Sequence, residues 1–107
     1  MKSAEVLSAL AQILQERKQA DPEQSYVASL YAGGVDAIAA KISEEAEETI
    51  DAAKTGDEQH IIHETADLWF HCLVLLSHLD IPPEQVLAEL QRRSGTSGHE
   101  EKARRGQ

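Results

Sequence analysis

Five carboxylates lie at helical spacing in two clusters of the chain. The first cluster reads EExxE and holds Glu44, Glu45 and Glu48, and the second reads ExxD and holds Glu64 and Asp67. Residues three and four apart lie on the same side of a helix, so each cluster should form one acidic face. Two such faces packed together bring like charges close, which is costly unless a cation lies between them. Hard cations prefer oxygen ligands, so the pattern predicts Mg²⁺, with Mn²⁺ as a substitute.

The alternative interpretation of the first cluster is a solvated helix face, because glutamate is a good helix former. Glu64 and Asp67 weaken that alternative, since they lie on an otherwise apolar helix where unpaired acids are costly. Two lysines lie near the clusters in sequence, Lys41 before the first and Lys54 between the two. They offer too little positive charge to compensate the five acids. We therefore predict one metal site built from both clusters.

The histidines and the cysteine next to these acids need separate interpretation. His63 and Glu64 begin like the zinc signature HExxH, but Asp67 stands in the last place, so the signature fails. His71 lies one turn beyond Asp67 and could be a metal ligand, a partner that orients a ligand, or a core histidine. A carboxylate-rich Mg²⁺ site does not need it, so we favour a non-ligand role. Cys72 lies in an apolar stretch and is predicted to be a buried thiol, not a nucleophile.

Helices must position these side chains. Alanine and leucine are plentiful and glycine is sparse, which favours helix over sheet. We expect helices over about residues 3–19, 23–31, 35–54, 58–79 and 82–93. Gly33-Gly34 and Gly56 are candidate stops, and Asp57 is a candidate N-cap. The sequence therefore predicts an all-α fold.

The two long helices have different predicted faces. In 35–54 the carboxylates lie opposite a core face formed by Val35, Ile38, Ile42, Ala46, Ile50 and Ala53. In 58–79 the apolar arc is so wide that the helix should be buried on most sides, with a single polar stripe. A chain this short has few other elements to cover that arc, so we expect at least a dimer.

Composition and charge limit the classes of function. The 107 residues fit one domain, 1–107, with a basic tail from about residue 92. The net charge of −9 argues against a general nucleic-acid binder. The longest apolar stretch, 68–79, is too short to span a bilayer. The polar start argues against a signal peptide, and the lone Cys72 suits a reducing, cytoplasmic compartment.

The distribution of charge says more than its total. Between Lys41 and Asp67 there are nine acids and two lysines, whereas Arg92 to Arg105 holds five basic residues and two acids. An acidic middle and a basic tail suit a substrate that brings both metal and phosphate.

At these residues the chain resembles the phosphoribosyl-ATP pyrophosphatase family, which belongs to the MazG-like all-α nucleotide pyrophosphohydrolases. EExxE and ExxD mark the wider group. The narrower family adds Ser25-Tyr26, the run DLxxHxxVLL that starts at Asp67, and a tail similar to RRxGxSGxxEKxxR that starts at Arg92. The chain departs in having Phe70 where the family often has Tyr, and the register of its tail differs by about one residue.

The resemblance implies a MazG-like helical bundle assembled as a homodimer, with the active site near the subunit contact. It implies hydrolysis of phosphoribosyl-ATP to phosphoribosyl-AMP and pyrophosphate, the second step of histidine biosynthesis. Mg²⁺ would be held by Glu44, Glu48, Glu64 and Asp67. Glu45 would be a ligand or a base, and Glu45 and Glu48 are the catalytic candidates. The candidate substrate-binding residues are Ser25, Tyr26, Lys41, Arg92, Arg93, Ser97, Lys102 and Arg105.

Three alternatives stay open on the residues alone. One is a MazG-like housecleaning enzyme that acts on a different nucleoside triphosphate, against which Ser25-Tyr26 and the tail argue. Another is a di-iron carboxylate bundle, which requires paired Glu-x-x-His motifs, but Glu64 is followed three residues later by Asp67. The third is a non-catalytic helical interaction module, which metal-dependent activity would exclude.

Overall fold

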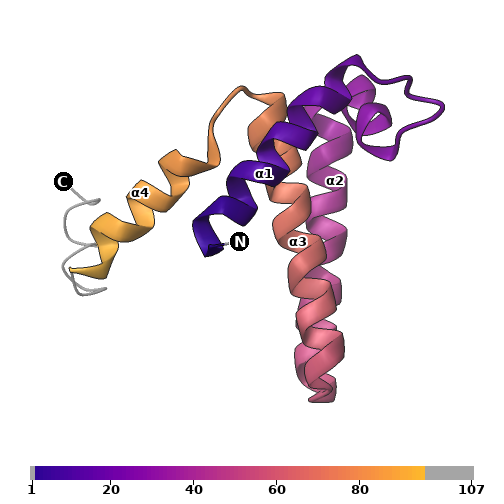
Figure 1. Ribbon diagram of the computed structural model, residues 1–107. Coiled ribbons are helices and arrows are strands. Elements are labelled where there is room, and N and C mark those ends of the chain that lie inside the picture. Colours follow the sequence, from indigo (N-terminus) through magenta and orange to yellow (C-terminus); the bar gives the residue numbers. More distant parts are fainter. Residues whose placement is uncertain (1, 96–107) are drawn as a thin grey trace, which may run out of the picture.

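The computed structural model describes residues 2–95 of the chain, and within them it contains helices and no strand. The elements are α1 (Ser3–Glu16), the 3₁₀ turn η1 (Arg17–Gln19), α2 (Tyr26–Thr55), α3 (Glu58–His78) and α4 (Pro83–Ser94). Figure 1 shows α2 and α3 as a long pair side by side, with α1 near the upper part of α3 and α4 standing away from the pair. The predicted all-α class is confirmed.

A tight turn joins α2 to α3 and makes them antiparallel. Gly56 closes α2 in the left-handed conformation, with φ 76° and ψ 7°, which a glycine adopts without steric cost. Asp57 caps α3, because its Oδ1 accepts a hydrogen bond from the His60 backbone N–H at 3.3 Å. The predicted stop at Gly56 and the predicted cap at Asp57 are both confirmed, and the turn fixes which residues of the two helices face each other.

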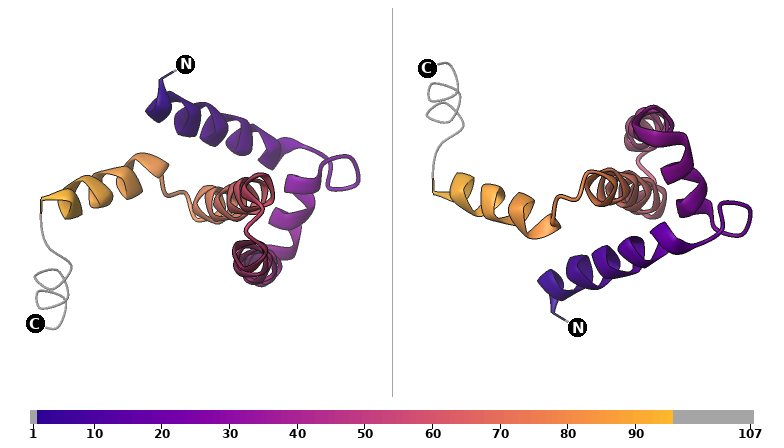
Figure 2. Two further views of the ribbon diagram at one scale, coloured as in Figure 1. Left: turned by 90° about the horizontal axis from the view of Figure 1, so that it is seen from below. Right: turned by 90° about the horizontal axis from the view of Figure 1, so that it is seen from above.

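A kink divides α2 into two parts. Gly34 has φ 76° and ψ −168°, a backbone region that is essentially restricted to glycine. Figure 2 shows the first part of α2 lying crosswise to the second, so the predicted stop at Gly33-Gly34 corresponds to a change of direction. The predicted start near residue 23 is wrong. The helix begins at Tyr26, because the Ser25 Oγ accepts from the Ala28 backbone N–H and a turn precedes it.

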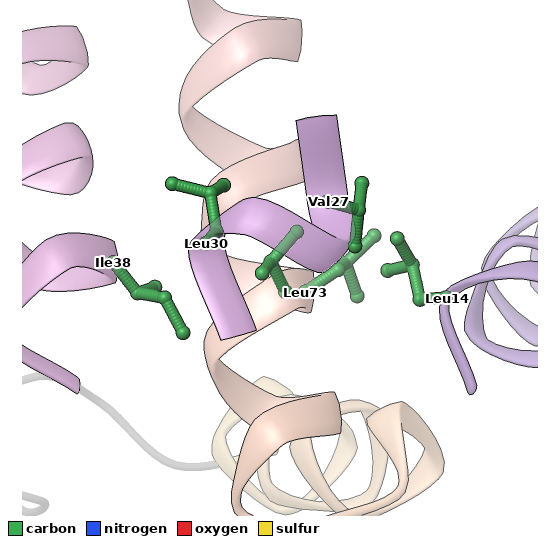
Figure 3. Close-up of a cluster of buried hydrophobic side chains, with 6 residues drawn as sticks. Leu14, Val27, Leu30, Ile38 and Leu73 are labelled. Atoms are coloured by element: carbon green, nitrogen blue, oxygen red, sulfur yellow. The ribbon is translucent and has the colours of Figure 1, made fainter. Parts of the chain in front are cut away.

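The apolar core lies where α1, α3 and the kinked part of α2 meet (Figure 3). Its buried side chains are Leu14, Val27, Leu30, Ile38, Leu73 and Val74. Because the kink lies between Leu30 and Ile38, both parts of α2 contribute to one core. This core anchors the end of the α2–α3 pair that lies beside α1.

The predicted core face of α2 is only partly correct. Ile38 is fully buried, but Ile50 is 55% exposed and Val35 and Ala53 are exposed as well. Glu45 and Ala52 are buried instead. Ile38, Glu45 and Ala52 are seven residues apart, so the stripe that packs against α3 passes through the carboxylate cluster. The helical wheel separated the acidic from the apolar side chains, but the hairpin turns part of the acidic face inward and leaves part of the apolar face exposed.

The prediction that α3 is buried on most sides is wrong for a single chain. Trp69 is 63% exposed and Ile62 is 53% exposed, although His71 and Val74 on the same helix are buried. The wide apolar arc that the sequence indicates is therefore present but only partly covered. Within residues 2–95, no helix has the length and apolarity needed to cross a membrane.

Candidate metal centre

The first carboxylate cluster lies on the second part of α2. Glu44, Glu45 and Glu48 each offer a carboxylate oxygen, and these oxygens lie within 4.8 Å of one another. Glu45 is buried at 6% exposure, whereas Glu44 is exposed. On α3, one ligand atom each from His63, Glu64 and Asp67 forms a second group of the same tightness.

The two clusters meet between the helices. Hydrogen bonding to Glu64 and, to a smaller extent, to Glu45 raises the pKa of the Glu48 carboxyl to about 7, and burial adds to the shift. Two of these acids come from α2 and the third from α3. The Thr49 Oγ1 lies 3.2 Å from the Glu64 carbonyl oxygen and ties the helices together beside the acids. The predicted convergence of the two clusters is therefore observed for Glu45, Glu48 and Glu64.

Two oxygens of this group are buried without a partner. They are the Oε2 atoms of Glu45 and Glu64. The other carboxylate oxygens have neighbours: the Glu64 Oε1 lies 3.4 Å from the His60 Nε2. The Glu45 Oε1 lies 3.8 Å from the Lys41 Nζ. A buried carboxylate oxygen without a donor is costly, and each such oxygen in a folded protein requires an explanation. An all-oxygen donor set fits a hard divalent cation.

Lys41 is the positive group beside the first cluster. Its Nζ lies 3.0 Å from the Glu44 Oε2, and that hydrogen bond raises the pKa of the ammonium. Lys41 therefore pairs mainly with the exposed Glu44. Among the contacts of residues 2–95, Glu48 and Glu64 have no close lysine or arginine partner. The acids therefore retain an excess of negative charge.

Histidines border the acids on α3. His63 Nε2 lies 3.4 Å from the Asp67 Oδ2, one helical turn away. His71 is buried and uses both ring nitrogens: Nε2 bonds the Tyr26 hydroxyl and Nδ1 bonds the Asp67 carbonyl oxygen, each at 2.7 Å. This arrangement favours the predicted non-ligand role. The contact between His60 and Glu64 agrees with the single polar stripe predicted for this helix, because residues four apart share a helix face.

Cys72 follows His71 on the same helix but is not part of the cluster. Its side chain is only partly buried, and burial raises the pKa of its thiol. A raised pKa disfavours the thiolate, which is the nucleophilic form. The interpretation of Cys72 as a structural thiol therefore agrees with its surroundings, although its burial is less complete than expected.

The candidate substrate residues lie at different places. Ser25 caps α2 and Tyr26 begins it, so these two lie at the crosswise part of the helix. Arg92 and Arg93 lie on α4, where both contact Glu89, and Figures 1 and 2 show this helix standing away from the α2–α3 pair. The other three, Ser97, Lys102 and Arg105, lie outside the described residues.

One basic residue near Tyr26 was not singled out by the sequence. Arg17 lines a shallow groove at the turn before α2, together with Ala20, Gln24, Ser25, Tyr26 and Val27. Arg17 lies in η1, immediately after the amphipathic α1. No spacing relates it to the acidic clusters, so only the fold reveals that it is beside Tyr26.

Comparison with known proteins identifies relatives over nearly the full chain. The model of the family described as phosphoribosyl-ATP pyrophosphohydrolase matches residues 7–94. The phosphoribosyl-ATP pyrophosphatase of Nitrosomonas eutropha is 52% identical over 105 residues, which is 98% of this chain and 90% of the relative. The proteins of the same name from an Azoarcus species and Aromatoleum aromaticum are 57% and 56% identical over 101 residues, 94% of each chain.

Proposed function

The chain belongs to the phosphoribosyl-ATP pyrophosphohydrolase family, and we propose on that premise that it hydrolyses phosphoribosyl-ATP to phosphoribosyl-AMP and pyrophosphate in histidine biosynthesis. The observation that supports this most is the meeting of Glu45, Glu48 and Glu64 between α2 and α3, with two buried oxygens unpartnered. A divalent cation that accompanies the triphosphate would supply the positive charge that these acids lack.

We propose Mg²⁺ as the resident cation, with Mn²⁺ as a substitute. Glu45, Glu48 and Glu64 would hold it at the centre, because Glu48 has both of the other acids as neighbours. Glu44 and Asp67 belong to the same carboxylate groups on α2 and α3 and would lie at either side. When bound, a divalent cation neutralises phosphate charge and lowers the pKa of bound water, which makes hydrolysis of a phosphoanhydride feasible at neutral pH. The presence of oxygen donors alone in the central group favours these hard cations over Zn²⁺.

The carboxylates also handle protons in the proposed reaction. Water that attacks phosphorus must lose a proton, and a nearby carboxylate can accept it. Glu45 and Glu48 are the candidates, because they lie at the centre of the cluster and Glu48 faces acids of both helices. His60 and Lys41 lie beside the outer oxygens of Glu64 and Glu45, at 3.4 Å and 3.8 Å, and would help to orient these side chains.

Basic groups would bind the phosphates of the substrate. Lys41 is next to the acids, and Arg17 lines the groove beside Tyr26. Phosphoribosyl-ATP carries a second phosphate, on its ribosyl group, that an ordinary triphosphate lacks. Arginine binds phosphate with paired hydrogen bonds, so Arg17 and the basic residues of the tail are suited to recognise it. The proposed tail residues are Arg92, Arg93, Ser97, Lys102 and Arg105.

We propose that the chain works as a homodimer with residues 1–107 as one domain. The exposed Trp69 and Ile62 on α3 and Ile50 on α2 would be covered by a second copy. This contact would lie along the same two helices that carry the acids, which places the active site near the subunit contact. A reducing cytoplasm is the proposed compartment, since Cys72 has no partner cysteine in the chain.

The test of this function is product analysis with the purified protein. Phosphoribosyl-ATP and Mg²⁺ should give phosphoribosyl-AMP and pyrophosphate, with much lower kcat/KM for ATP and other nucleoside triphosphates. Truncation after Ser94 should raise KM for phosphoribosyl-ATP while leaving helix content unchanged. Equal or better turnover of another triphosphate would indicate a MazG-like housecleaning enzyme, and an absence of hydrolysis of every triphosphate would refute the proposal.

A further inference from the structure

A buried histidine links the two halves of the candidate site. His71 is 5% exposed, lies on α3 and contacts Tyr26 from the first part of α2. On its other side it bonds the backbone oxygen of Asp67, one turn earlier on its own helix. Both contacts are 2.7 Å, short for hydrogen bonds of this kind. The proposed function assigns no role to this histidine.

The chemistry of the partners fixes the direction of both bonds when the imidazole is neutral. The Asp67 carbonyl oxygen can only accept, so Nδ1 of His71 carries the proton that is donated to it. In the neutral imidazole, Nε2 then has a lone pair and no proton. The Tyr26 hydroxyl must therefore donate its single proton to Nε2. The direction of this bond leaves the Tyr26 oxygen able to accept hydrogen bonds but unable to donate one elsewhere.

The surroundings hold this arrangement in place. The ring of Phe70 lies edge-on to the imidazole, with centroids 5.4 Å apart and an interplanar angle of 90°. The Tyr26 ring approaches the imidazole at 5.8 Å and 83°, also edge-on. The imidazole is therefore held between two aromatic rings and the Asp67 carbonyl, with little freedom to rotate.

Tyr26 lies near both carboxylate clusters. Burial raises the pKa of its hydroxyl, and the charged groups close enough to act on it are Lys41, Glu45, Glu44 and Asp67. Tyr26 is also 51% exposed, whereas His71 is not accessible to a ligand. A bound substrate could therefore touch Tyr26 but reach His71 only through it.

We propose that His71 is a positioning residue, which orients the Tyr26 hydroxyl so that its oxygen accepts a hydrogen bond from the nucleoside part of the substrate. Phosphate oxygens at neutral pH mainly accept hydrogen bonds, so they are poor partners for a hydroxyl whose proton is already donated. A ribose hydroxyl or an adenine amino group is a suitable donor. This inference rests on the proposed hydrolase function, and it assigns Tyr26 to the nucleoside instead of the phosphates.

A double-mutant cycle tests the role in substrate binding. Tyr26→Phe and His71→Leu should each raise KM for phosphoribosyl-ATP by about 10-fold, the value of one neutral hydrogen bond, with kcat nearly unchanged. In the Tyr26→Phe background, His71→Leu should change KM by less than about 2-fold, since no oriented hydroxyl remains. His71→Gln should restore much of the affinity, because its amide oxygen can accept the hydroxyl proton.

Tyr31→Phe is the matched control, because the Tyr31 hydroxyl bonds the Leu14 carbonyl oxygen and Ser77 in the core, away from the acids. It should lower the thermal midpoint and leave KM unchanged. If His71→Leu raises KM equally with and without the Tyr26 hydroxyl, the proposed role is wrong and His71 serves packing. If the wild type does not turn over phosphoribosyl-ATP, the hydrolase function fails, and the next experiment still decides the hydrogen bond.

Nitrogen-15 NMR of the metal-free wild type tests the hydrogen bond directly. It does not depend on whether a variant of His71 folds. At a pH where the imidazole is neutral, Nδ1 should carry the proton and Nε2 should not. In Tyr26→Phe, which keeps the ring, the Nε2 signal should move and the Nδ1 signal should stay nearly constant. A proton on Nε2 in the wild type would reverse the hydroxyl direction and overturn the proposal.

Discussion

Glu48 lies between acids of both helices, since its neighbours are Glu64 across the helix pair and Glu45 on its own helix. Glu48→Gln or Glu64→Gln should lower turnover by about 100-fold or more, since each replaces a carboxylate of the proposed cation site by a neutral amide. Glu48→Gln also removes a candidate proton acceptor. The fold should survive, because the substitution also relieves repulsion.

The matched control for this experiment is Glu47→Gln, which removes an exposed charge of the same helix. It should leave turnover nearly unchanged. Circular dichroism and thermal midpoints show whether each variant is folded. Near-normal turnover of both Glu48→Gln and Glu64→Gln at saturating Mg²⁺ would show that these carboxylates do not form the metal site.

The same residue predicts how stability depends on pH. The pKa of Glu48 is about 7 in the folded protein, above its ordinary value of 4.5. Between these values the folded state binds more protons than the unfolded state. Glu48 therefore favours folding fully below about pH 4.5, and this contribution is lost as pH rises through about 7. The thermal midpoint of the metal-free wild type should fall more steeply with rising pH than that of Glu48→Gln, between about pH 5 and about pH 7.5.

Divalent metal should change that comparison. A cation binds the ionised carboxylates, so Mg²⁺ or Mn²⁺ should raise the midpoint of the wild type above about pH 7 by mass action. The response of Glu48→Gln should be smaller. Parallel pH curves for the wild type and Glu48→Gln, in the absence of metal, would contradict the position assigned to this carboxyl.

Residue types and spacing were enough to predict the acids, but not the geometry around them. EExxE and ExxD indicate which side chains share a helix face, because helical periodicity is local. The burial of Glu45 and the pairing of Tyr26 with His71 depend on how α2 packs on α3, and residues 26 and 71 are far apart in the chain. No local pattern contains that information.

At the scale of the elements, the kink at Gly34 sets the position of Tyr26 relative to the acids. Gly34→Ala should destabilise the protein by about 1–3 kcal/mol, because φ 76° with ψ −168° is strained for any residue with a Cβ atom. Urea unfolding measures this loss. Gly34→Ala should also raise KM if the first part of α2 shifts and draws Tyr26 away from His71.

Gly95→Ala is the control for the kink, since Gly95 has φ −100° and a Cβ there would meet no atom within 4 Å. It should change the free energy of unfolding by only a few tenths of a kcal/mol. Equal stability of Gly34→Ala and wild type would mean that α2 is continuous through residue 34. The glycine pair was a sufficient sequence signal for the break. Its angle depends on how the first part of α2, which lies crosswise in Figure 2, packs in the core with residues of α1 and α3.

At the scale of the whole molecule, the uncovered apolar side chains predict association. Light scattering at micromolar concentration should give a mass of about twice the 11.7 kDa of one chain. Trp69→Glu should raise the dissociation constant by roughly 30-fold or more, because a large exposed aromatic residue is a typical centre of an interface.

Gln59→Glu adds the same charge at an exposed position of α3 and serves as the control. It should leave the mass unchanged. A monomer with a native helix content at micromolar concentration would refute the dimer.

The sequence indicated this surface through the wide apolar arc of residues 58–79, but it could not show which part stays uncovered, because that depends on how α1, α2 and α4 pack around α3.

The central claim is that the acids of α2 and α3 hold a divalent cation that hydrolysis of phosphoribosyl-ATP requires. The most direct measurement is pyrophosphate release from phosphoribosyl-ATP after treatment with a chelator, followed by titration with Mg²⁺. Release should be absent in the chelator, should return saturably with Mg²⁺, and should require a higher Mg²⁺ concentration in Glu64→Gln, if turnover remains measurable there. Full release in the chelator, or the same Mg²⁺ midpoint and rate in Glu64→Gln, would contradict the claim.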